Sequence, residues 1–79
     1  MSKEFYKKKL VDLRAKLAKE KEDKKKDNAR IAEYIKKASP ASKDSYKKRK
    51  IDAAASHDRK IESLKKEIER TTEALKRAK

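Results

Sequence analysis

The chain lacks cysteine, glycine and tryptophan, and its 79 residues include a single proline and a single histidine. The absence of cysteine excludes a disulfide framework and thiolate metal sites. The absence of glycine excludes the phosphate-cradling loops of nucleotide-binding enzymes and the tight turns that build oxyanion holes. Several classes of enzyme and of disulfide-rich secreted protein are therefore unlike this sequence.

Long apolar runs are also missing. No segment reaches the length of a signal-peptide core or of a membrane-spanning helix. Binding to a membrane surface is not expected either, because the apolar positions lack the Trp, Phe and Leu residues that hold helices on a bilayer. We therefore expect a soluble protein of the cytoplasm with no membrane partner.

Charge is what the chain has in abundance. Charged residues make up 52% of the sequence, and 27 basic against 14 acidic residues leave a net charge of +13. This composition is typical of long helices and coiled coils, but also of disordered chains. The excess favours an acidic partner such as nucleic acid or an acidic protein. A lysine-rich surface that only keeps a coiled coil in solution is an equally good alternative.

Apolar residues recur at alternating spacings of three and four in both halves of the chain. This rhythm indicates two amphipathic helices with narrow apolar stripes, close to the seam of a coiled coil. The residues predicted to pack between the helices are Leu10, Leu13, Leu17, Ile31, Tyr34, Ile61, Leu64, Ile68 and Leu75.

Polar residues interrupt this seam near its middle, at Glu20, Lys24, Asp27 and His57. The segment 19–28, KEKEDKKKDN, contains no apolar residue at all. Local fraying is the favoured interpretation, since no apolar burial there offsets the cost of ordering the chain. A hinge, or a polar device that fixes the pairing register, are the alternatives.

The one proline separates the two halves. Ser39 followed by Pro40 fits a helix N-cap with proline at the first helical position. Pro40 also disfavours helical backbone at Ser39, so the first helix should end near Ala38. A single helix kinked at Pro40 is the competing interpretation.

Matching of the two seams favours a hairpin. When facing residue numbers sum to 81, as for Leu13 with Ile68, seam meets seam along the whole length. The same register sets Leu10 opposite Thr71, Tyr6 opposite Leu75, Leu17 opposite Leu64, Lys24 opposite His57, Asp27 opposite Ala54 and Ile35 opposite Tyr46. We predict one all-α domain, a two-helix antiparallel coiled-coil hairpin with helices over about 3–38 and 41–78 and a turn at 39–41.

A thinner apolar stripe lies beside the seam. We call it the partner stripe, and its members are Val11, Ala18, Ala32, Ile35 and Ile51. Two helices alone bury few apolar side chains, so an isolated hairpin is expected to be marginally stable. We therefore expect the stripe to pack on a second copy, giving a homo-oligomer such as a four-helix bundle, or on a protein partner.

Basic residues concentrate around the turn, where residues 30–50 contain eight basic and two acidic side chains. The candidate anion-binding residues are Lys36, Lys37, Lys43, Lys47, Lys48, Arg49 and Lys50. Lysine suits salt-sensitive contact with a phosphate backbone, whereas base readout needs arginine, asparagine or glutamine. Non-specific nucleic-acid binding is thus the alternative function.

Catalysis finds no support in the sequence. His57 stands next to Asp58, but a catalytic pair needs a pocket that two thin helices cannot enclose. No second histidine follows three or four residues away to complete a metal site. We predict a non-enzymatic protein without catalytic, cofactor-binding or metal-binding residues and without a small-molecule substrate.

A serine-rich turn precedes a Lys-Ile-x-x-Leu-x-x-x-Ile run, and the residues concerned are Ser39, Ser42, Ser45, Lys60, Ile61, Leu64 and Ile68. In these features residues 8–78 resemble the N-terminal helical-hairpin module that precedes TIR-like, nuclease or other effector domains in bacterial defence-type proteins. The resemblance implies a bacterial or phage source and a non-catalytic role in oligomerisation or docking. No effector domain follows within the sequence, so we expect an isolated module or an effector on another polypeptide.

Overall fold

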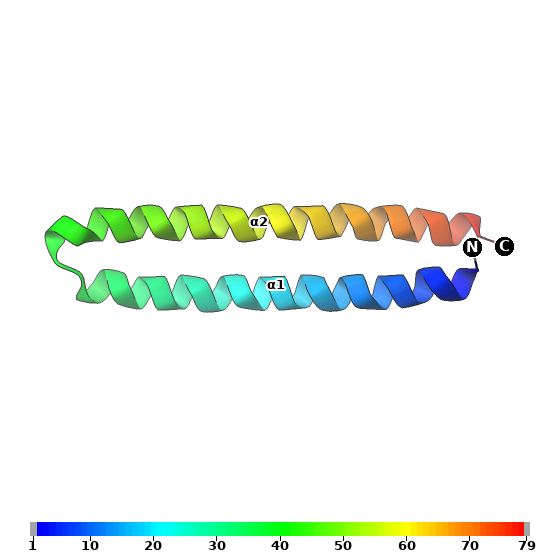
Figure 1. Cartoon of the computed structure of the whole chain (residues 1–79), viewed down its shortest axis with the longest axis horizontal. Coiled ribbons are helices and arrows are strands. Elements are labelled where there is room, and N and C mark those ends of the chain that lie inside the picture. Colours follow the sequence, from blue (N-terminus) through cyan, green and yellow to red (C-terminus); the bar gives the residue numbers. More distant parts are fainter. Residues whose placement is uncertain (1, 79) are drawn as a thin grey trace.

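The protein is an antiparallel hairpin of two long α-helices, seen here in a computed structural model that describes residues 2–78 (Figure 1). Helix α1 spans Lys3–Lys37 and helix α2 spans Pro40–Arg77. The start of α1 and the end of α2 lie together at the end opposite the turn. The hairpin measures 61 × 14 × 11 Å. The predicted all-α two-helix hairpin is confirmed, and no strand occurs in residues 2–78.

Two extended residues form the turn. Ala38 has φ −76° and ψ 150°, and Ser39 has φ −66° and ψ 157°. Pro40 accounts for this geometry, because its ring disfavours helical backbone at the residue before it while its own fixed φ suits the first helical position. No residue of the described chain has a positive φ, so the reversal needs no glycine.

The helix caps differ from the expected arrangement in one respect. Ser39 occupies the N-cap position of α2, but its hydroxyl makes no bond to a backbone N–H and donates instead to Ser42 Oγ at 3.2 Å. The Ser39 carbonyl accepts from the N–H groups of Ser42 and Lys43 at 2.9 and 3.1 Å. A side-chain cap exists on α1, where Ser2 Oγ accepts from the Phe5 N–H at 3.4 Å.

The best-buried contacts lie in the half of the hairpin away from the turn. Leu10 and Leu13 are 6% and 3% exposed, and Thr71, which the register sets opposite Leu10, is 4% exposed. The Thr71 hydroxyl donates to the Glu67 carbonyl at 2.8 Å, so this polar side chain is satisfied within its own helix. The other predicted packing residues apart from Tyr34 are half-buried, namely Leu17, Ile31, Ile61, Leu64, Ile68 and Leu75.

Tyr34 packs across the helices although half of its side chain is exposed. Its side chain is 51% exposed, and its ring stacks on Tyr46 with centroids 5.9 Å apart and planes at 28°. The predicted register set Tyr46 opposite Ile35, and Tyr46 stacks instead on Tyr34, the residue before Ile35. A tyrosine ring gains from stacking across the helices while its hydroxyl stays in water, which a narrow seam does not allow.

The segment 19–28 does not fray in the structure, and it continues α1 without a break. Its seam positions carry polar side chains that bond across to α2. Lys24 Nζ lies 2.6 Å from Asp58 Oδ1, and two further side chains of α1 bond to His57. Cross-helix hydrogen bonds therefore take the place of apolar packing in the middle of the hairpin.

Replacing Leu13 by alanine should lower the free energy of unfolding by about 2–3 kcal/mol, because the substitution leaves a cavity in the best-buried part of the seam. The matched control is Lys8→Ala, which truncates an exposed side chain of the same helix to the same residue. It should change stability by less than about 0.5 kcal/mol. Urea unfolding followed by circular dichroism measures both, and equal losses would contradict this position for the core.

Candidate interaction surface

His57, in the middle of α2, is held between two carboxylates of α1. Its Nδ1 lies 2.5 Å from Glu20 Oε1, and its Nε2 lies 2.7 Å from Asp27 Oδ2. Glu20 and Asp27 stand about two helical turns apart on the seam side of α1, so they reach the imidazole from opposite directions. The side chains of His57 and Glu20 are only 14% and 16% exposed. We call these three residues the histidine clamp.

The clamp requires a doubly protonated imidazole. Both ring nitrogens face carboxylate oxygens, which can only accept, so both nitrogens must donate. The hydrogen bond to Asp27, followed by that to Glu20, raises the pKa of His57. The hydrogen bond from His57 in turn lowers the pKa of Asp27, which also accepts from the Arg30 guanidinium at 2.7 Å. The clamp thus holds a proton between the helices and leaves no ring nitrogen for a substrate.

Sequence reasoning placed His57 near Lys24 and Asp27, and it missed Glu20 as a partner. The signal was present, because Glu20 and Asp27 flank Lys24, the residue that the register sets opposite His57. What decided the outcome is the sign of the charges. An imidazolium is attracted to the two flanking carboxylates and repelled by the ammonium, so Lys24 turns aside to Asp58.

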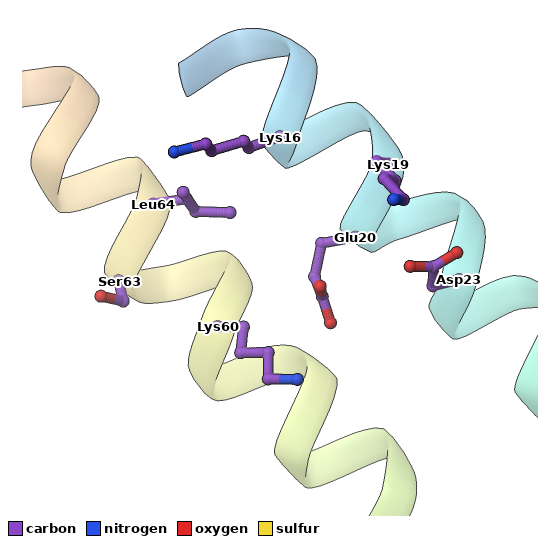
Figure 2. A pocket seen from close by; sticks show the side chains of 7 residues that line it. All are labelled: Lys16, Lys19, Glu20, Asp23, Lys60, Ser63 and Leu64. Atoms are coloured by element: carbon purple, nitrogen blue, oxygen red, sulfur yellow. The ribbon is translucent and has the colours of Figure 1, made fainter. Parts of the chain in front are cut away.

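A shallow groove of mixed charge lies beside the clamp, and it is lined by Lys16, Lys19, Glu20, Asp23, Lys60, Ser63 and Leu64. Figure 2 shows Leu64 pointing from α2 toward α1, with Glu20 and Lys60 in the space between the helices. Acidic and basic side chains share this groove, so no single sign of charge selects a ligand. Across residues 2–78, no cluster of three His, Asp or Glu side chains has the geometry to hold a metal ion.

The partner stripe lies largely on the surface. Val11 is 64% and Ile51 69% exposed, Ala18 is exposed, and Ala32 and Ile35 are half-buried. Near the turn, members of the stripe share a shallow groove between the two helices with three lysines. We call it the turn groove, and its lining residues are Ala32, Ile35, Lys36, Lys47, Lys50 and Ile51. Toward the other end, Val11 lies in a separate hollow of α1 lined by Lys7, Lys8, Val11 and Asp12.

The candidate anion-binding residues surround the turn and are mostly free of carboxylate partners. Lys43 and Lys50 are half-buried, and the other five are exposed. Lys36 pairs with Glu33 at 3.5 Å, and no other member of the set forms an ion pair within residues 2–78. The positive charge predicted at this end of the hairpin is therefore not neutralised internally.

An aromatic row of Tyr34, Tyr46 and Arg49 lies at the turn. The Arg49 guanidinium lies 5.7 Å from the centre of the Tyr46 ring, which also stacks on Tyr34. Cation–π and stacking contacts of this kind hold flat groups in order on a surface. The register already brings Tyr34 and Tyr46 to the same level of the hairpin, but the heptad rhythm alone assigned Tyr34 to the seam.

The clamp predicts that the hairpin is less stable at alkaline pH. The protonated His57 stabilises the fold fully below about pH 6.5, its ordinary pKa, and this contribution is lost as the pH rises through the raised pKa of the folded state. Asp27 contributes above pH 3.8 and loses its contribution as the pH falls through its lowered pKa. The melting temperature should therefore be higher at about pH 5.5 than at about pH 9.

The control is His57→Gln, which retains hydrogen-bonding capacity but does not titrate. Since His57 is the only histidine of the chain, this variant should melt at nearly the same temperature at both pH values. Melting curves by circular dichroism supply the measurement. An unchanged pH dependence in the variant would show that the clamp is not its origin.

Neither helix of the described chain carries an apolar stretch long enough to cross a membrane. Three candidate features remain on the described chain, namely the clamp, the partner stripe with its turn groove, and the basic residues with the aromatic row. Comparison of the chain with protein-family models, curated proteins and solved structures found no match.

Proposed function

We propose that the chain is a non-enzymatic helical interaction module that packs against another helical surface through its partner stripe. One observation carries the proposal. Val11 and Ile51 are 64% and 69% exposed on a hairpin whose described residues include only two buried apolar side chains, Leu10 and Leu13. Burying a large aliphatic side chain is worth about 1.5–3 kcal/mol, so covering Val11 and Ile51 would add a gain comparable to that from Leu10 and Leu13.

A second copy is the partner expected in the purified protein. Two hairpins that pack side by side form a four-helix bundle, an arrangement that gives each stripe a helical surface to cover it. Each copy carries a net charge of +13, so mutual repulsion opposes the contact. Salt screens this repulsion over a Debye length of about 10 Å at 0.1 M, and it should therefore strengthen self-association.

The resemblance of residues 8–78 to the hairpin modules of bacterial defence-type proteins supports the same role. In those proteins the hairpin precedes an effector domain. By this analogy the chain would bring an effector into an assembly, with the stripe as the contact surface. The analogy adds no catalytic residue to the chain, and it agrees with the lack of a free imidazole nitrogen at His57.

Sedimentation equilibrium at several salt concentrations tests self-association. We expect a dimer or larger species whose dissociation constant falls as salt rises, and a loss of at least about tenfold in affinity for Val11→Ser with Ile51→Ser. The control Ala15→Ser with Ala29→Ser alters two exposed positions of α1 outside the stripe and should leave the association unchanged. A folded monomer under all conditions would rule out the second copy as partner.

The basic turn end favours a second candidate function, non-specific binding of a nucleic-acid backbone. Six of the seven candidate anion-binding residues form no ion pair within the described residues, and the row of Tyr34, Tyr46 and Arg49 lies among them. Lysine point charges give contact with phosphates that releases counterions and carries little sequence preference. Exposed aromatic rings can add stacking on bases.

Binding of a labelled DNA duplex across a salt series tests this candidate. We expect the affinity to fall steeply between about 50 and 200 mM salt, which is the opposite of the trend for self-association. Lys47→Glu with Lys50→Glu should weaken binding by at least about tenfold, whereas Lys65→Glu with Lys66→Glu, the same change at exposed positions farther along α2, should have a smaller effect. Equal effects would show that overall charge, and not the turn end, attracts DNA.

A further inference from the structure

The turn groove joins apolar and basic side chains in one place. Ala32 and Ile35 of α1 and Ile51 of α2 provide its apolar surface, and Lys36, Lys47 and Lys50 line it with them. Ile51 is 69% exposed, so much of this apolar surface is open to a partner. The groove lies at the end of the hairpin that holds the turn, drawn in green in Figure 1.

Charge distinguishes the turn groove from the two other hollows described above. No acidic side chain lines it, whereas Asp12 lies in the hollow around Val11, and Glu20 and Asp23 lie in the groove beside the clamp. Lys47 and Lys50 form no ion pair within residues 2–78. Lys36 pairs only with Glu33, at 3.5 Å between exposed side chains, and such surface pairs are weak.

We infer that the turn groove binds an acidic amphipathic helix of another polypeptide. The apolar side chains of that helix, spaced at i, i+3, i+4 and i+7, would cover Ile35 and Ile51, and its flanking Glu or Asp residues would meet the three lysines. Two antiparallel helices present a long shallow surface between them, which suits a third helix better than a globular knob. This inference rests on the proposed function and names the chemistry of the partner.

Two other occupants fit the groove less well. A second copy brings the same excess of +13 and presents lysines to lysines at this end of the hairpin. A nucleic-acid backbone would satisfy the lysines, but its phosphates and sugars would leave the apolar surface of Ile35 and Ile51 uncovered or poorly matched. An acidic amphipathic helix satisfies both the apolar and the charged part of the groove.

The probe is a synthetic, stapled helical peptide of about 15 residues, long enough for four turns, with leucine at i, i+3, i+4 and i+7 and glutamate on both flanks. A matched peptide carries glutamine in place of every glutamate. Fluorescence anisotropy measures binding of each peptide to the full chain. The chain concentration is kept below the dissociation constant of its self-association. We expect the glutamine peptide to bind at least about tenfold more weakly than the acidic one.

Variants of the chain locate the site. Ile51→Ser changes the apolar surface, and Lys47→Gln with Lys50→Gln removes two of the charges. Each change should lower the affinity of the chain for the acidic peptide by at least about tenfold. The controls make the same kinds of change in the hollow at the other end of α1, and they are Val11→Ser and Lys7→Gln with Lys8→Gln. Their affinity for the acidic peptide should stay within about twofold of that of the unaltered chain. Circular dichroism checks that every variant is helical.

Three results would overturn the inference. The first is equal affinity for the glutamine peptide and the acidic peptide. The second is an equal loss of affinity in the site variants and the control variants. The third is a loss of affinity on changing Lys47 and Lys50 with no loss for Ile51→Ser. The last result, together with displacement of the peptide by a DNA duplex, would assign the lysines to nucleic acid. Sedimentation separates this inference from the proposed function. A chain that self-associates through the stripe but ignores the acidic peptide keeps its proposed function and refutes this partner, whereas the absence of both contacts refutes both.

Discussion

The contact of His57 with Glu20 and Asp27 joins the middle of α2 to α1 in one register, the same register that the apolar seam and the turn at Pro40 favour. Two carboxylates reach one imidazolium from opposite directions, so a shift by one helical turn would break at least one of the two hydrogen bonds. Apolar side chains tolerate such shifts, since burial depends on area and not on direction. A buried polar contact in a coiled coil is therefore a natural device for fixing register.

The polar clamp also goes with a small core and an exposed apolar surface. Charged residues occupy the middle of the seam, so the best-buried contacts are confined to Leu10, Leu13 and Thr71 in the half away from the turn. Near the turn, Tyr34 stacks on Tyr46 but stays 51% exposed, and Ile51 stays 69% exposed. The same distribution that makes the isolated hairpin poor in core leaves apolar side chains available to a partner.

The charged side chains differ between the two ends of the partner stripe. Around Val11 the charged side chains are Asp12 and two lysines, whereas all charged side chains that line the turn groove are lysines. Electrostatic complementarity mainly selects partners and steers their approach, while apolar burial supplies affinity. The proposed binding of an acidic helix would use both contributions in the turn groove.

The sequence by itself determined the two helices, the hairpin and the place of its turn. The heptad rhythm and Pro40 are local features, and they act the same way in any surroundings. The basic turn end could also be predicted, because net charge simply adds along the chain. Only the tertiary structure decided that Lys24 bonds to Asp58, that His57 bonds to both Glu20 and Asp27, and that Tyr34 stacks on Tyr46. These outcomes depend on which side chains of α1 and α2 come within a few ångströms, and on the sign of their charges, neither of which a periodicity contains.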